Sequence, residues 1–293
     1  MVKAKKLKGV SLFDYVNCAI MILFAIITLY PFWYVISVSL TEYSQFINTK
    51  FLLYPKGINF EAYKIILTEE SLYRSFILTA SVVVVYVVLH VFLCFITAYP
   101  LSKKNVPGRN FMLLLVVIPM VFSGGMIPTY LVIKSLGLMN TYTVLIITGA
   151  FSAYNTVLMK NFISQVPDAL EEAAKIDGAN DYYILFKIYL PMSLPIIATI
   201  ALFAAVGKWN DYGTALYYIS NSKLYPIQNV LRSMLVENSI DTVSGGFGQA
   251  EAFKLQTSSK MAAVVVATVP VVAVYPFVQK YFVKGIMLGS VKG

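Results

Sequence analysis

Long apolar runs without a charged residue dominate the chain, and polar segments separate them. Six runs approach or exceed the ~20 residues that a helix needs to cross a bilayer. They are Tyr15–Thr41, Ser75–Leu101, Asn110–Ile133, Asn140–Met159, Ile188–Gly207 and Met261–Gln279. Because lipid offers no partner to an unpaired backbone group, each run is expected to be a helix. Interior prolines are expected to interrupt or kink these helices at Pro31, Pro119, Pro128, Pro195, Pro270 and Pro276.

Composition supports a membrane protein and excludes most other classes. Of the 293 residues, 58% are hydrophobic and 13% are charged, against roughly 25% charged in a soluble domain. The net charge of +9 could indicate nucleic acid, but in so apolar a chain basic residues more often mark the cytoplasmic ends of helices. Cys18 and Cys94 both lie in apolar runs and form no metal-ligand spacing. We therefore expect membrane lipid, and no nucleic acid, as a partner.

Basic residues in the short connections predict the orientation. The link between the second and third runs carries Lys103, Lys104 and Arg109, whereas the link between the third and fourth carries only Lys134. Both termini are therefore expected in the cytoplasm. The whole chain, 1–293, is expected to form one membrane domain, with extracellular loops at 42–74 and 208–260 and a cytoplasmic loop at 160–187.

The predicted cytoplasmic loop is rich in acidic residues, whereas cytoplasmic loops of membrane proteins usually carry an excess of Lys and Arg. Pro167 followed by Asp168 opens a helix, and Gly178 supplies a left-handed stop about ten residues later. One face of this helix is expected to carry Leu170, Ala173, Ala174 and Asp177. Asn180 or Asp181 can then cap a second segment. Periodicity alone leaves open whether the helix enters a groove on a partner or lies in the membrane interface.

The loop sequence EEAAKIDGAND, followed by Leu190-Pro191, resembles the EAA loop of permease subunits in binding-protein-dependent ABC importers. The resemblance extends to segments elsewhere in the chain, which are Ser123–Pro128, Leu136–Leu138, Trp209–Tyr212 and Lys284–Gly293. These segments look like the carbohydrate branch of the family, similar to the smaller maltose permease subunit, and like the subfamily importing oligosaccharides from complex polysaccharides. The resemblance implies an all-α, type I importer permease with six transmembrane helices in a bacterial cytoplasmic membrane.

The same resemblance implies partners and a contact site. The partners would be a second, different permease subunit, a cytoplasmic ABC ATPase dimer, an extracytoplasmic solute-binding protein and an oligosaccharide substrate. The residues implied to couple to the ATPase are Glu171, Glu172, Ala173, Ala174, Asp177 and Gly178.

Catalytic chemistry is missing from the sequence. No G-x-x-x-x-G-K-[ST] motif occurs, so ATP hydrolysis is expected to belong to a partner and no cofactor is expected. His90 is the only histidine, and in the middle of an apolar run it is expected to hydrogen-bond between helices rather than relay protons. We therefore expect a translocation subunit and not an enzyme.

A sugar pathway would need aromatic faces and neutral hydrogen-bonding groups near the middle or mouths of the spans. The candidates are Tyr86, Ser123, Gly124, Gly125, Tyr154, Asn155, Asn210 and Tyr212. Helix packing remains open as the alternative role for each of them. An ion-coupled secondary transporter of a polar solute also remains open, although the six runs hold no Asp, Glu, Lys or Arg for ion coupling. In such a carrier the acidic loop would be only regulatory.

The predicted orientation can be tested by labelling single cysteines in a variant in which Cys18 and Cys94 are first replaced by alanine. A cysteine replacing Val106, in the basic link, is expected to react with an impermeant reagent only after the membrane is permeabilised. A cysteine replacing Asn59 is expected to react in intact cells. Reversed labelling would overturn the inside and outside assignments together.

Overall fold

The computed structural model describes residues 12–42, 52, 54–236, 257–274 and 276. These residues form helices and no named strand, as expected for the all-α class. The chain divides into two compact units, residues 1–68 with 237–266 and residues 69–236 with 267–293. Each unit is described separately below.

The first unit contains the first apolar run. This run forms α1 (Leu12–Leu40), which keeps Pro31 inside the helix. Every side chain from Leu12 to Leu29 is exposed, as expected for a helix that faces lipid or a partner subunit. Beyond α1 the chain forms a single bridge between Thr41 and Ile58 and then α3 (Glu61–Thr68).

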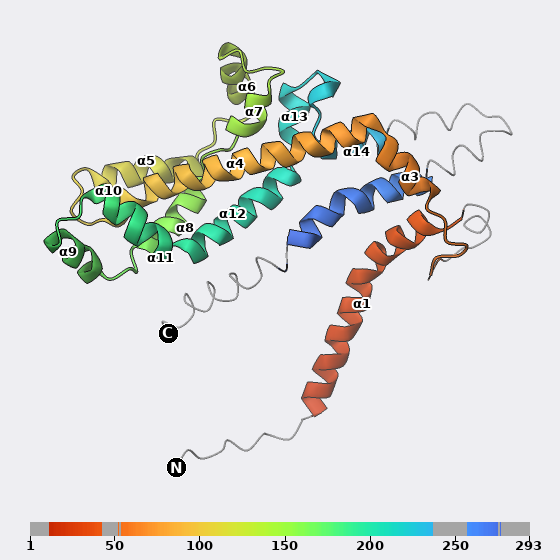
Figure 1. The fold of residues 1–293 in the computed structure, drawn as a ribbon, viewed down its shortest axis with the longest axis horizontal. Coiled ribbons are helices and arrows are strands. Elements are labelled where there is room, and N and C mark those ends of the chain that lie inside the picture. Colours follow the sequence, from red (N-terminus) through yellow and green to blue (C-terminus); the bar gives the residue numbers. More distant parts are fainter. Residues whose placement is uncertain (1–11, 43–51, 53, 237–256, 275, 277–293) are drawn as a thin grey trace. The chain divides into compact units, whose positions relative to one another are not determined.

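The second unit is built around one long helix, α4 (Glu70–Ser102). Helices α8 (Ala153–Ile163) and α12 (Leu194–Trp209) pack along it (Figure 1). Phe95, Met159 and Ile200, one from each helix, meet in a buried core. The remaining elements are α5 (Arg109–Val121), α6 (Met126–Ser135), α7 (Tyr142–Ile147), α9 (Asp168–Ile176), α10 (Asp181–Tyr183), the π-helix η1 (Ile184–Tyr189), α11 (Leu190–Met192), α13 (Gly213–Tyr218), the 3₁₀-helix η2 (Ser222–Leu224) and α14 (Ile227–Val236).

The described residues do not fix the number of membrane spans at six. Three helices, α1, α4 and Thr257–Val274, are long and apolar enough to cross a membrane. Two further pairs would qualify as bent spans, with α5 and α6 meeting at 115° and Asp181–Met192 meeting α12 at 74°. By length and composition the described chain therefore holds three to five spans, and six stays a prediction. The end of the sixth run at Gln279 lies outside the described residues.

One of the two bends coincides with an expected proline. The break before α12 lies at Ser193, and Pro195 stands in the first turn of α12, so the interruption expected there is found. Pro119 and Pro128 lie inside α5 and α6. The third run breaks between them, at residues 122–125, where Gly125 adopts a φ of +86° that other residues rarely reach.

The prediction of one continuous helix over Asn140–Met159 is wrong. The run forms two short helices, α7 and α8, separated by residues 148–152. Gly149 has a left-handed φ of +79° there, and the Ser152 hydroxyl caps α8 by accepting from Asn155 N at 3.3 Å. A glycine turn followed by a capping serine therefore overrides the apolar character of the run.

The predicted cytoplasmic helix is confirmed. It spans Asp168–Ile176, and Gly178 follows it with a φ of +80°. The Asn180 side chain caps α10 by accepting from Tyr183 N at 2.8 Å. The predicted loops contain helical residues, since α8 extends into 160–187 and α4 begins within 42–74, and their boundaries stay a prediction. Residues 237–256 of the third predicted loop lie outside the described chain.

Candidate functional site

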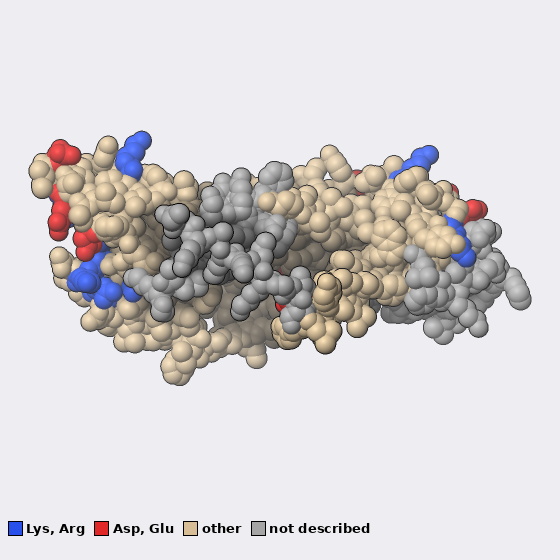
Figure 2. Space-filling model, turned by 90° about the horizontal axis from the view of Figure 1, so that it is seen from below, with Lys and Arg blue, Asp and Glu red and all other residues tan. Residues whose placement is uncertain are grey.

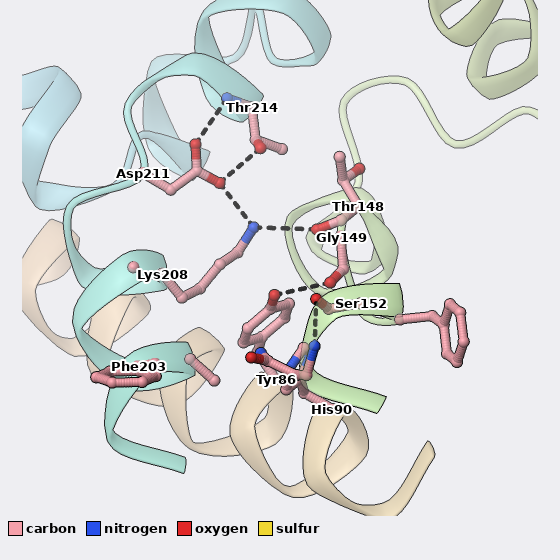
Figure 3. A pocket seen from close by; sticks show the side chains of 13 residues that line it. Tyr86, His90, Thr148, Gly149, Ser152, Phe203, Lys208, Asp211 and Thr214 are labelled. Carbon is pink, nitrogen blue, oxygen red and sulfur yellow. Dashed lines mark hydrogen bonds and ion pairs between the residues drawn. The ribbon is translucent and has the colours of Figure 1, made fainter. Parts of the chain in front are cut away.

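Three polar side chains of α4 point at the gap between α7 and α8. Tyr86, His90 and Cys94 are spaced four residues apart, so they lie above one another on a single face. Their contacts are Tyr86 Oη to Gly149 O (2.8 Å), His90 Nδ1 to Ala150 O (2.9 Å) and Cys94 Sγ to Ser152 O (3.9 Å). We call these three residues the polar ladder of α4; Figure 3 shows Tyr86 and His90.

The polar ladder compensates for the broken helix. Residues 148–152 lie outside the regular helices, and the carbonyls of Gly149 and Ala150 accept from side chains of α4, whereas Ser152 O keeps its helical donor, Thr156 N. A buried carbonyl left without a donor would cost about 1–3 kcal/mol. The ladder side chains are themselves almost fully buried, and His90 is 2% exposed. The gap is therefore stabilised by side chains of the neighbouring helix.

His90 behaves as the expected bridge between helices. The carbonyl of Ala150 can only accept, so Nδ1 of His90 carries the proton. Its Nε2 lies 2.9 Å from the Asn155 amide nitrogen and accepts from it. Both ring nitrogens are thus used in the neutral form of the ring, and the bonds join α4 to the gap and to α8.

A cavity of about 580 Å³ lies beside the polar ladder, within the range of roughly 300–1,000 Å³ typical of ligand sites. It is lined by Tyr86, His90, Thr148, Gly149, Phe151, Ser152, Asn155, Phe203, Ala204, Gly207, Lys208, Asp211 and Thr214. Lys208 is 8% exposed, and its Nζ lies 2.7 Å from Asp211 Oδ2. The ammonium also lies 3.5 Å from Thr148 O and 5.0 Å from the Tyr86 ring centre.

The ion pair lies at the end of α12. Lys208 belongs to the last turn of this helix, and its ammonium lies beside Tyr86, the central residue of α4. The apolar runs themselves hold no charged residue, but the end of the short α12 brings Lys208 and Asp211 beside the middle of α4. Neither residue was among the predicted pathway residues, although the spacing of Lys208 and Asp211 in KWND was a visible signal.

The cavity brings together two of the eight predicted pathway residues, Tyr86 and Asn155. The other six lie elsewhere. Ser123, Gly124 and Gly125 form the exposed break between α5 and α6, and Tyr154 is 61% exposed on α8. Asn210 ends α12, and Tyr212 stacks under the Arg232 guanidinium, 4.4 Å from the ring centre. Because Tyr86 and Asn155 also bond within the chain, helix packing remains an open role for them.

A second site surrounds the cytoplasmic helix α9. Glu171 turns inward from this helix, and its carboxylate binds Lys103, which follows the end of α4. It also accepts from Tyr189 Oη in η1 at 3.0 Å and from Lys175 Nζ at 2.8 Å. The Lys103 ammonium in turn lies 3.9 Å from the centre of the Tyr189 ring. One carboxylate therefore fastens α9 to two other elements of the second unit.

The other predicted coupling residues face outward or line a hollow. Glu172, Ala173, Asp177 and Gly178 are exposed, and Ala174 is half-buried against the core. A hollow of about 590 Å³ lies between α9 and the segment formed by α10 and η1. The expected face of α9, with Leu170, Ala173, Ala174 and Asp177, lines it. Figure 2 shows acidic and basic side chains gathered at this end of the second unit, on the left.

The charges around Glu171 hold it ionised. Burial alone would raise the pKa of this carboxyl, but hydrogen bonds from Lys103, Lys175 and Tyr189 lower the pKa of Glu171 from its ordinary 4.5 to about 2. The same pairing raises the pKa of Lys175. Glu171 therefore keeps its negative charge throughout the physiological range.

Comparison with known proteins decides the class. The family described as "Binding-protein-dependent transport system inner membrane component" matches residues 90–288. This chain belongs to that family. The resemblance noted in the EAA-like loop is thereby confirmed, and the chain is a multi-pass permease subunit of the inner membrane.

Two relatives from Bacillus subtilis (strain 168) match nearly the whole chain. The polygalacturonan/rhamnogalacturonan transport system permease protein YtcP is 44% identical over 285 residues, covering 96% of this chain and 99% of the relative. Protein LplC is 43% identical over 286 residues, covering 98% and 97%. A crystal structure of a bacterial ABC transporter that imports the acidic polysaccharide alginate contains a chain with a TM-score of 0.85 and 32% identity, covering 96% of this chain and all of that one.

Replacing Tyr86 with Phe should show whether the polar ladder stabilises the fold. The change leaves the Gly149 carbonyl without its donor, so we expect a loss of about 0.5–1.5 kcal/mol, seen as a lower melting temperature of the purified complex. Tyr154→Phe, at an exposed position of α8, is the matched control and should be neutral. Unchanged stability together with reduced uptake per assembled complex would assign Tyr86 to the substrate path instead.

Replacing Glu171 with Gln should loosen α9. At pH 7 the variant is expected to melt at a lower temperature than the parent, whereas Glu172→Gln, at an exposed neighbour, should not. The folded-state pKa of Glu171 is below its ordinary value, so its stabilisation is complete above about pH 4.5 and is lost as pH falls toward 2. The difference in melting temperature between parent and variant, measured by thermal unfolding in detergent, should become smaller as the pH falls from about 4.5 toward 2. A constant difference would refute the ionic role.

Proposed function

We propose that this chain forms one half of the translocation pore of an ATP-driven importer, which receives oligosaccharides from a solute-binding protein. The family assignment supports an import permease. One similar protein is described as part of a polygalacturonan/rhamnogalacturonan transport system and another as belonging to an importer of alginate, which supports a carbohydrate cargo. The other half of the pore would come from a second, different permease. The membrane would be a bacterial cytoplasmic membrane, with both termini in the cytoplasm.

The observation that carries the coupling mechanism is the attachment of α9. Glu171 ties this helix to Lys103 at the end of α4 and to Tyr189 in η1. The neighbouring Glu172 and the 86%-exposed Ile176 remain free to meet another protein. We infer that α9 is the contact for a cytoplasmic ABC ATPase dimer, which would hydrolyse ATP on behalf of this subunit.

Helix α4 connects the proposed ATPase contact to the cavity, so it can pass movement from one to the other. When the ATPase dimer closes and displaces α9, the charged bonds of Glu171 pass the displacement to the end of α4. The same helix carries the polar ladder and lines the cavity. Motion at the cytoplasmic end therefore reaches the proposed pathway through one continuous helix, and the pore would alternate between inward-open and outward-open states.

The ion-coupled carrier receives no support from the family or from these relatives. Lys208 and Asp211 do supply ionisable groups at the depth of the centre of α4. Their pairing with each other leaves no net charge, and an ATP-independent uptake measurement would separate the two classes directly.

Gly178 offers a test of coupling. A valine there would have open space around its Cβ, but the φ of +80° would strain it by roughly 1–2 kcal/mol. We expect Gly178→Val to tilt α9 and lower both transport and the ATPase stimulation caused by loaded binding protein. Gly178→Asn is the matched control, since asparagine tolerates this conformation.

Glu172→Lys tests the same contact by reversing an exposed charge, and it should reduce ATPase stimulation without changing membrane insertion. The readout is ATP hydrolysed by the reconstituted complex with and without loaded binding protein. If Gly178→Val and Glu172→Lys both assemble and respond as the parent does, α9 is not the coupling contact.

A further inference from the structure

The cavity beside α4 contains a charge arrangement that a neutral sugar would not require. Among the 13 described residues that line it, Lys208 is the one Lys or Arg and Asp211 the one acid. An ionisable side chain at this depth is costly and usually marks a functional site. The contacts of Lys208 and Asp211 show which of the two side chains can move to bind another group.

Asp211 is held in place without Lys208. Its Oδ1 accepts from Thr214 N at 3.0 Å and its Oδ2 accepts from Thr214 Oγ1 at 2.6 Å, at the start of α13. Lys208 is held by fewer contacts. Apart from Asp211, its ammonium has only the Thr148 carbonyl at 3.5 Å and the Tyr86 ring at 5.0 Å. The lysine can therefore turn toward a new anion while the aspartate keeps two hydrogen bonds.

The surrounding groups fit the rest of a sugar. Phe151 and Phe203 provide apolar ring surfaces, and Asn155 and Ser152 provide neutral polar groups on the same cavity. The space of about 580 Å³ would admit one or two sugar rings.

We propose that Lys208 is a specificity-determining residue of the pathway, which exchanges Asp211 for the carboxylate of a uronate-containing oligosaccharide. This inference rests on the proposed import function and narrows it to acidic cargo. Asp211 acts as a stand-in anion, which keeps the ammonium paired between passages of substrate. A flexible four-carbon stem and a compact charge make lysine suited to such an exchange.

The test uses the complete importer in proteoliposomes containing ATP, with a uronate trisaccharide as the probe. Its methyl-esterified or carboxyl-reduced counterpart serves as the neutral comparison, chosen so that the isolated binding protein holds it. Uptake is measured per assembled complex. Lys208→Gln is expected to lower uptake of the acid at least tenfold and uptake of the neutral sugar less than twofold, while Lys208→Arg keeps most of the acid uptake.

Asp211→Asn is the matched variant, because its side-chain oxygen can still accept from Thr214. Because the change removes the anion that competes for Lys208 but leaves the lysine charged, it should raise the ratio of acid to neutral uptake, which Lys208→Gln should lower. If Lys208→Gln and Asp211→Asn lower assembly alike, or lower uptake of both sugars alike, the pair is only structural and the proposal fails. If the parent complex imports neither sugar, the proposed function itself fails.

Discussion

The break between α7 and α8 shapes the second unit. Residues 148–152 separate the two helices, and the carbonyls of Gly149 and Ala150 take their donors from α4. Tyr86 and His90 supply these donors, and Cys94 lies beside the Ser152 carbonyl. The cavity exists because α7 stops at the gap and α12 stops at Trp209. The hydrogen bonds between α4 and residues 149–150 thus bury Tyr86 and His90 and place them on the wall of the cavity through which a substrate could pass.

At the cytoplasmic end, the partly buried carboxylate of Glu171 holds α9 to the rest of the second unit by hydrogen bonds and ion pairs. Glu171 satisfies two lysines and a tyrosine at once, and its charge in turn keeps Lys103 paired near the end of α4. Tyr189 contributes from a π-helix, a rare form that often occurs at functional sites. Of two adjacent glutamates, one therefore secures the helix to its own chain and the other remains exposed on its surface.

The sequence predicted most of what local signals control. Apolar runs located the long helices, and Pro167, Gly178 and Asn180 set the limits of α9 and α10. The prediction of a continuous helix was wrong in the fourth apolar run, where the left-handed turn at Gly149 interrupts an otherwise apolar sequence. Lys208 was left out of the pathway because it follows the last apolar residue of its run, and the sequence does not show that its ammonium lies beside Tyr86. No local pattern could pair Lys103 with Glu171, which are 68 residues apart.

The regular spacing of the polar ladder restricts how the second unit can move. If α4 slid along α8 by a single turn, the bonds of Tyr86, His90 and Cys94 to the gap would all break in one step. The ladder therefore holds α4 and α8 in one register, so that the two helices would move together as a rigid body. The ladder does not extend to the joints at Ser193 and around Gly125, where the chain turns by 74° and 115°. We therefore expect movement within the second unit to occur at these two joints.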